Sequence, residues 1–300
     1  MNANQRRKRR HHHVWQTYLR PWTTDRGLFC LQDGRVFPSG TRVLAVQTDF
    51  YKLQRLTPHD LTLLKLLFGQ GHPAAVRTHA SLVAGLIAPF ESAERFRGSP
   101  NWSEIEAQLD EHASNVLEDY HASIESSFRP SLERALAGDL GFYADDDECI
   151  TFLNYLCTQY LRTRGIKERV LELSPALERV WNVIIHIAAT NVGASLYLER
   201  KRRKLVVVQN FSKVPFVVSD QPAINLKGRR PVPTDRLSIY YPISPTAALL
   251  MADVDEEPLF SATGLTAEQA NELNHLVVRA AHLQVFARSA SCLERYADVR

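Results

Sequence analysis

The stretch LVVVQ at residues 205–209 decides the fold class, because the sequence becomes strand-like at this point. Three more short runs rich in Val, Ile, Leu and Tyr follow it, at Phe216–Ser219, Leu237–Tyr241 and Ala247–Met251. Prolines and glycines separate these runs, as expected of turns between short strands. The last part of the chain is therefore predicted to form a β-sheet.

The sequence that precedes this stretch is helical in pattern. The predicted helices are Pro58–Phe68, Trp102–Phe128, Ile150–Leu161 and a segment from Ser174-Pro175 to about Glu199. After the sheet, Thr266 is a plausible N-cap for an amphipathic helix that extends to Gln284. We expect this last helix to close the sheet.

The N-terminal part has a different pattern again. Gly27 to Tyr51 is predicted to form short strands broken by turns, with Asp33-Gly34 as a hairpin signal. The chain is thus expected to have an α+β fold, with an N-terminal β-meander, a helical middle and a C-terminal β-sheet closed by a helix. Residues 1–10 are expected to be a disordered basic tail and residues 11–290 a single domain, which can be subdivided at 11–56, 57–199 and 204–290.

Composition excludes several classes of protein. The hydrophobic fraction of 45% and the charged fraction of 23% are those of an ordinary globular protein. No stretch approaches the roughly 20 apolar residues of a membrane span, so we expect no membrane partner. Met1–Arg10 lacks the apolar segment of a secretory signal. The four cysteines show no C-x-x-C spacing, which fits a reducing cytoplasm better than a disulfide framework.

The formal net charge is only +3, but the basic residues are clustered. One run consists of Arg6, Arg7, Lys8, Arg9 and Arg10, and a second contains Lys201, Arg202 and Arg203. Runs of this kind can neutralise phosphates and give nucleic-acid binding that does not depend on base sequence. The alternative is a solvated tail and a charged connector between a helix and a strand.

Several short motifs occur in an order that resembles a known family. They are His11-His12, Tyr18-Leu19, Asp49-Phe50-Tyr51, Gln159-Tyr160-Leu161-Arg162-Thr163, Ser219-Asp220-Gln221-Pro222, Pro242-Ile243-Ser244-Pro245 and Asn274. This order is similar to that of the family catalogued as "domain of unknown function 4238", found mainly in bacteria, and it spans roughly residues 11 to 287. The family usually has a proline where this chain has Trp15. The resemblance implies one cytoplasmic globular unit, an effector or accessory protein, and supplies no established chemistry.

The two motifs near the chain ends contain the first candidate site residues. An imidazole of His11 or His12 can act as a general base near neutral pH or bind a metal. Asp220 follows an apolar run and should emerge at a strand end, where its carboxylate can bind a divalent metal, orient a histidine or activate water. Asp220 can equally form a hydrogen-bonded turn before Pro222, and the histidines can be structural.

Two helical segments supply the remaining candidates. Arg162 lies at the end of a predicted helix and can clamp a phosphate, or else satisfy the last helix carbonyls. Glu111, Glu118 and Glu125 recur every seven residues, which places three carboxylates along one helical face. Glu118 also begins a Glu-x-x-His pattern that ends at His121, a pattern that metal sites in helical bundles use.

The leading functional hypothesis is a metal-assisted hydrolase of nucleic-acid phosphodiesters, acting as a bacterial toxin or defence effector. His11 or His12 serves as base or metal ligand, Asp220 and Glu118 as metal ligand or orienting carboxylate, and Arg162 as phosphate clamp. The metal, if one binds, is expected on His12 and Asp220. The alternatives are a non-catalytic nucleic-acid or protein interaction module, and a sensor of a small anion at Arg162. The hydrolase hypothesis requires the two polar motifs to meet in space.

Overall fold

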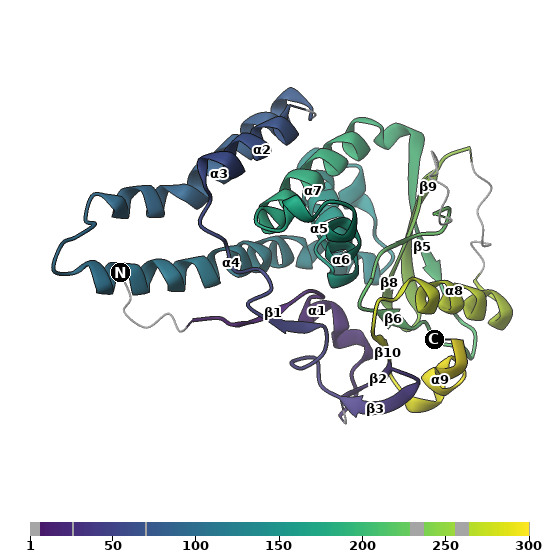
Figure 1. The fold of residues 1–300 in the computed structure, drawn as a ribbon. Helices are drawn as coiled ribbons and strands as arrows, with labels where there is room; N and C mark the ends of the chain where they lie inside the picture. The colour runs from purple at the N-terminus through teal and green to yellow at the C-terminus, as the bar shows by residue number, and fades with distance from the viewer. Residues whose placement is uncertain (1–6, 26, 70, 229–236, 256–263, 300) are drawn as a thin grey trace.

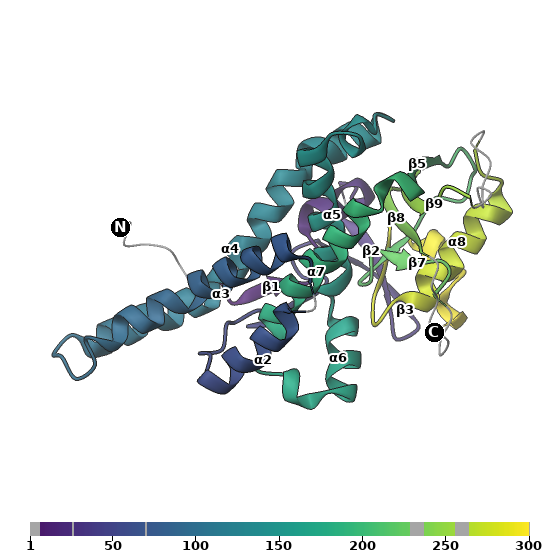
Figure 2. The same cartoon turned by 90° about the horizontal axis from the view of Figure 1, so that it is seen from above.

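The computed structural model describes residues 7–25, 27–69, 71–228, 237–255 and 264–299. The fold is α+β, with an N-terminal strand region, a helical middle and C-terminal sheets, as the sequence predicts. Long helices lie on one side of the molecule and the larger sheets on the other (Figure 1). From above, the longest helix and its neighbour project together beyond the rest of the fold (Figure 2).

Helices form most of the middle of the chain. They are α1 Gln16–Leu19, α2 Pro58–Phe68, α3 Pro73–Glu94, α4 Trp102–Leu136, α5 Asp146–Leu161, α6 Arg164–Leu173 and α7 Trp181–Leu198, followed later by α8 Ala267–Ala280 and α9 Ala290–Glu294. Side-chain caps fix where several of them begin, because they satisfy N–H groups that the first turn leaves unpaired. Thr57 and Asp60 form a capping box on α2, Asp145 accepts from the Glu148 N–H on α5, and Thr266 caps α8.

Within the described residues, the strands form three antiparallel sheets. They are β1 Arg10–His12, β2 Leu28–Gln32, β3 Arg35–Ser39, β4 Val46–Thr48, β5 Arg203–Gln209, β6 Val218–Ser219, β7 Ile224–Asn225, β8 Ser238–Ser244, β9 Ala247–Asp253 and β10 Val285–Ala287. Their orders are β1-β4, β3-β2-β10-β6 and β5-β9-β8-β7. The four-stranded sheet β3-β2-β10-β6 joins the N-terminal and C-terminal parts of the chain, because β10 pairs with β2 on one side and with β6 on the other.

The predicted β-meander is found only in its first hairpin. Asp33 (φ 50°) and Gly34 (φ 71°) make the turn between β2 and β3, with the positive φ angles that a tight hairpin requires. The strand region predicted between Gly27 and Tyr51 does not continue directly after β3, because residues 41–43 form a turn, residues 44–45 a bend, and Ala45 adopts a φ of 48°. The strand that follows, β4, pairs with β1 instead of β3.

Two helix ends differ from the prediction. The helix α4 continues beyond Phe128 to Leu136, with Pro130 inside it. The helix α8 stops at Ala280 instead of Gln284, and β10 begins soon afterwards. The N–H groups of residues 282–284 all donate to the carboxylate of Asp220, at 2.7 to 3.0 Å, and so leave the helical pattern.

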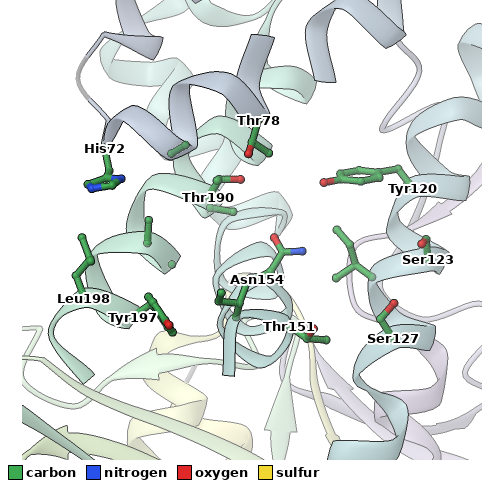
Figure 3. A pocket seen from close by; sticks show the side chains of 16 residues that line it. His72, Thr78, Tyr120, Ser123, Ser127, Thr151, Asn154, Thr190, Tyr197 and Leu198 are labelled. Atoms are coloured by element: carbon green, nitrogen blue, oxygen red, sulfur yellow. The ribbon is translucent and has the colours of Figure 1, made fainter. Parts of the chain in front are cut away.

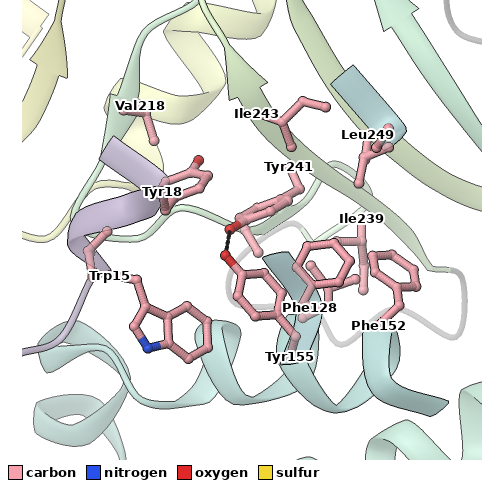
Figure 4. Close-up of a cluster of buried hydrophobic side chains, with 14 of the residues drawn as sticks. Trp15, Tyr18, Phe128, Phe152, Tyr155, Val218, Ile239, Tyr241, Ile243 and Leu249 are labelled. Atoms are coloured by element: carbon pink, nitrogen blue, oxygen red, sulfur yellow. Dashed lines mark hydrogen bonds between the residues drawn. The ribbon is translucent and has the colours of Figure 1, made fainter. Parts of the chain in front are cut away.

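One of the core clusters is built around the N-terminal segment of residues 11–22, which packs against both helix α5 and strand β8. Trp15 stacks on Tyr155 of α5 with ring centroids 4.3 Å apart, and Tyr18 stacks on Tyr241 of β8 at 4.8 Å (Figure 4). The hydroxyls of Tyr155 and Tyr241 hydrogen-bond to each other at 2.8 Å. Buried tyrosines need such partners, since an unpaired hydroxyl in the core is costly. The segment thereby connects helix to sheet.

None of the helices in the described part of the chain is both long enough and apolar enough to cross a bilayer.

Two buried histidines predict how stability depends on pH. His13 and His186 are almost fully buried, and this burial lowers the pKa of each to about 3. The unfolded chain binds a proton on each histidine near pH 6.5, whereas the folded chain does not. The free energy of unfolding should therefore fall as the pH is lowered, by about 1 kcal/mol for each histidine between pH 7 and 5.5. Urea unfolding at the two pH values measures this loss.

The variant His186→Phe should reduce that loss by about 1 kcal/mol, because it removes one of the protons taken up on unfolding. His59→Phe is the matched control, since His59 is exposed at the start of α2. An unchanged pH dependence in His186→Phe would contradict the assignment.

Candidate functional site

The end of α5 brings together groups from distant parts of the chain. Arg162 is the C-cap residue of this helix and is only 1% exposed. Its Nε donates to the Tyr51 hydroxyl at 3.0 Å, and its Nη2 donates to the carbonyl of His12. The guanidinium lies over the rings of Trp15 and Tyr51, 4.6 and 5.0 Å from their centroids. A buried cation is therefore held rigidly by two aromatic faces and two hydrogen bonds.

The third nitrogen of this guanidinium, Nη1, is buried and has no hydrogen-bond partner among the described residues. The guanidinium borders a small pocket of about 60 Å³, which we call the Arg162 pocket. Its lining is His12, Trp15, Gln16, Glu118, His121, Ala122, Glu125 and Arg162. A pocket of this size has room for water or for one small polar group.

Two carboxylates of α4 face the same pocket. Glu118 and Glu125 are seven residues apart and so share one face of the helix. The Oε2 of Glu118 is buried and has no hydrogen-bond partner in the described structure. The Oε1 of Glu125 accepts from the N–H of Thr17 at 3.2 Å and from its hydroxyl. Burial raises the pKa of Glu125, although the nearby Arg162 charge opposes this shift.

The histidines of the pocket are kept neutral by their surroundings. Burial lowers the pKa of His12, and the charge of Arg162 lowers it further. The His12 Nε2 lies 3.3 Å from the carbonyl of Arg42, and its Nδ1 lies 3.3 Å from the amide nitrogen of Gln16. Burial also lowers the pKa of His121, whose ring nitrogens have no hydrogen-bond partner among the described residues. Its Nδ1 is 4.0 Å from the Glu118 carboxylate.

Exposed arginines lie close to this pocket. The charge of Arg10 acts on the pKa of His12, and the charge of Arg20 acts on that of Glu125. The main chain of Arg42 accepts hydrogen bonds from both His12 and Arg10. All three arginines are exposed.

The structure thus brings together three of the five predicted catalytic residues, His12, Glu118 and Arg162. The other two, His11 and Asp220, do not line the pocket. His11 is fully buried, with Nε2 2.8 Å from the Lys8 carbonyl and Nδ1 accepting from the Tyr51 N–H at 2.7 Å. Both ring nitrogens of His11 therefore hydrogen-bond to main-chain groups.

Asp220 lies directly after β6, at the strand end where the sequence predicts it. Both of its carboxylate oxygens accept main-chain N–H groups of residues 282–284. The metal pair proposed from sequence, His12 and Asp220, is therefore divided between the Arg162 pocket and this turn. No group of three or more His, Cys, Asp or Glu in the described part of the chain is arranged to hold a metal ion.

The histidine motif at residues 11–13 and the Ser219–Pro222 motif both contact the same end of helix α5. Gln159 donates to the carbonyl of His13 at 3.2 Å, and Arg162 donates to that of His12. On the other side, Thr163 donates to the side chain of Gln221, which donates in turn to the carbonyl of Tyr160. The motif near residue 220 therefore meets the histidine motif through the end of α5.

The basic runs are largely engaged with acidic side chains. Arg6 lies outside the described residues, while Arg7, Lys8 and Arg9 form ion pairs with Asp110, Asp119 and Asp49. The tail expected to be disordered thus contacts α4 through Arg7 and Lys8, and Arg10 begins β1. In the second run, Arg203 pairs with Asp253 at 2.7 Å and with Glu199 at 3.0 Å, whereas Lys201 and Arg202 are exposed.

Sequence reasoning missed Glu125 as a site residue, although the seven-residue repeat of glutamates contains it. It also missed Gln16 and Trp15, which line the pocket. The one local signal for Gln16 was its position, because it is a polar residue four positions after His12. The short helix α1 begins at Gln16. The contribution of Trp15 depends on α5, which is distant in sequence.

The environment of Asp220 predicts a mainly structural role. Asp220→Ala leaves three main-chain N–H groups without their acceptor, so the free energy of unfolding should fall by about 3 kcal/mol. The control Asp147→Ala removes an exposed carboxylate in the first turn of α5 and should cost less than about 1 kcal/mol. Urea unfolding of both variants tests this, and wild-type stability in Asp220→Ala would contradict it.

Comparison with known proteins gives one match. The sequence pattern of the family described as "Protein of unknown function (DUF4238)" matches residues 10–291. No curated protein and no solved structure is significantly similar to the chain. Because the match covers more than half of the 300 residues, the chain belongs to the DUF4238 family.

Proposed function

We propose that the chain is a hydrolase of nucleic-acid phosphodiesters and that its reaction takes place in the Arg162 pocket. The observation that carries the proposal is the unpartnered Nη1 of a buried, fixed arginine that shares a pocket with two carboxylates. A rigid donor of this kind stabilises charge on a substrate without having to reorganise. Hydrolysis needs such a donor, together with a base and an acid.

Arg162 is suited to bind a phosphoryl oxygen. Its charge is permanent, and its Nε and Nη2 are held by Tyr51 and the His12 carbonyl. The remaining donor, Nη1, can therefore hydrogen-bond to a non-bridging oxygen of a phosphodiester. The same contact strengthens as negative charge develops on that oxygen in the transition state.

The two glutamates can divide the proton transfers between them. Glu118 has a carboxylate oxygen without a partner, which can accept a proton from an attacking water. Glu125 has a raised pKa and can give a proton to the leaving oxygen as the phosphorus–oxygen bond breaks. Both carboxylates line the pocket that Arg162 borders, and seven residues of helix separate their Cα atoms by about 10 Å along the axis.

His12 and a divalent metal have supporting places in this proposal. The lowered pKa of His12 keeps its imidazole neutral at neutral pH, so it can act as a base or bind a metal together with Glu118. The experiment below therefore includes metal ions. The roles first proposed for His11 and Asp220 are not part of this mechanism, because their polar atoms hold the main chain.

Pocket size and surface charge support nucleic acid as the substrate. A volume of about 60 Å³ accepts a phosphoryl group but not a nucleotide, so most of the substrate must lie outside the pocket. Arg10, Arg20 and Arg42 are exposed, and we propose that they contact the flanking phosphates of a polynucleotide. A role as a bacterial toxin or defence effector stays a prediction.

The reaction can be tested with labelled RNA, single-stranded DNA and duplex DNA, each with and without Mg²⁺, Mn²⁺ or Zn²⁺. Glu118→Gln and Glu125→Gln should each lower kcat by about 100-fold or more, since they remove a proton acceptor or donor but keep the shape. The wild-type rate should fall as the pH rises through the pKa of Glu125, and this decline should vanish in Glu125→Gln.

Glu111→Gln is the matched control, because Glu111 precedes Glu118 by one seven-residue repeat on α4 and does not line the pocket. It should cleave at the wild-type rate. Binding without turnover, which weakens steeply with salt, would support an interaction module instead. Cleavage that persists in both pocket variants would also contradict the proposal.

A further inference from the structure

A second and much larger cavity lies on the opposite face of α4. Its volume is about 560 Å³, within the range of sites that bind small molecules. Tyr120, Ser123, Ile124 and Ser127 line it, whereas Glu118, Ala122 and Glu125 line the Arg162 pocket. At 100° per residue these two sets point to opposite sides of the helix. We call the larger space the four-helix cavity, because α3, α4, α5 and α7 surround it.

The walls of the four-helix cavity are largely apolar, and among the described residues they contain no carboxylate, lysine or arginine side chain, although His72 is part of the lining. Small and aliphatic residues form much of the lining, namely Ala75, Ile124, Ile150, Ala189, Gly193, Ala194 and Leu198. None of the described residues that line it is Asp, Glu, Lys or Arg. Ile150 is 48% exposed and Leu198 61% exposed, so apolar surface also extends to the rim. An ionic ligand would lose its hydration here without gaining a counter-charge.

Four neutral polar side chains converge on the interior. Thr78 comes from α3, Tyr120 from α4, Asn154 from α5 and Thr190 from α7, and their polar ends point toward one shared region (Figure 3). The amide of Asn154 offers both a donor and an acceptor, while the hydroxyls can do either. A few convergent polar groups within apolar walls are typical of a site that orients a ligand.

We propose that the four-helix cavity binds a neutral, largely apolar small molecule that carries an amide or a comparable donor–acceptor group. The apolar part contacts the aliphatic walls, and the polar group pairs with Asn154 and the neighbouring hydroxyls. Neutrality follows because the described lining contains no Asp, Glu, Lys or Arg, and His72 is its one histidine; the drug-like size follows from the volume. This site is separate from the Arg162 pocket and does not depend on the reaction proposed there.

Two dyes with the same aromatic scaffold test the proposal in the full chain. N-phenyl-1-naphthylamine is neutral, whereas 1-anilinonaphthalene-8-sulfonate carries a sulfonate. The neutral dye should bind saturably at one site per chain, as measured by fluorescence titration. The sulfonate should bind at least about ten-fold more weakly, because its charge would be desolvated without a partner.

Ala194→Phe should abolish binding of the neutral dye, because the new ring occupies the cavity. Ser195→Phe is the matched control, since Ser195 is exposed on α7 next to Ala194 and does not line the cavity. Ser123→Phe fills the cavity from α4 at an exposed position, and it provides a second blocking variant if Ala194→Phe fails to fold. Equal binding of both dyes, or neutral-dye binding unchanged in a folded blocking variant, would overturn the proposal.

Discussion

The burial of the Arg162 guanidinium between Trp15 and Tyr51 is the interaction on which the rest of the structure depends. A cation away from water must be compensated, and here it is compensated by two aromatic faces, a hydroxyl, a main-chain carbonyl and two nearby glutamates. Tyr51 returns a hydrogen bond to the Arg162 carbonyl at 2.6 Å. These contacts fix residues 11–22 on the end of α5, and they leave Nη1 of the guanidinium without a hydrogen-bond partner among the described residues.

The helix α4 also connects the Arg162 pocket with the four-helix cavity. One face of its middle part borders the Arg162 pocket, and the other borders the four-helix cavity. The aromatic rings of Tyr120 and His121 contact the ring of His186, with centroids 4.8 and 4.9 Å apart. A chain of packed rings therefore connects the two spaces. The two spaces lie on opposite sides of α4, and residues of this helix that are neighbours in sequence line one space or the other.

Local signals in the sequence account for much of the fold. The Asp33-Gly34 turn and the Thr266 cap depend on residues within a few positions, and both occur as predicted. The pairing of β10 with β2 and β6 joins segments far apart in sequence, and no periodicity indicates it. The same holds for Asp220, whose partners lie 62 to 64 residues away. Residue type predicted Arg162, Glu118 and His12 as candidates, but only the packing of α4 against the N-terminal segment brings them together.

We propose that the buried Arg162 keeps its Nη1 donor for a phosphodiester. Dimethyl phosphate is the smallest such group, and the thermal midpoint Tm can be measured against its concentration, with sodium chloride at matched ionic strength as the reference. We expect a saturable rise in Tm for the wild type, and none for Arg162→Lys, which lacks the guanidinium geometry. No rise in the wild type, or an equal rise in both proteins, would contradict it.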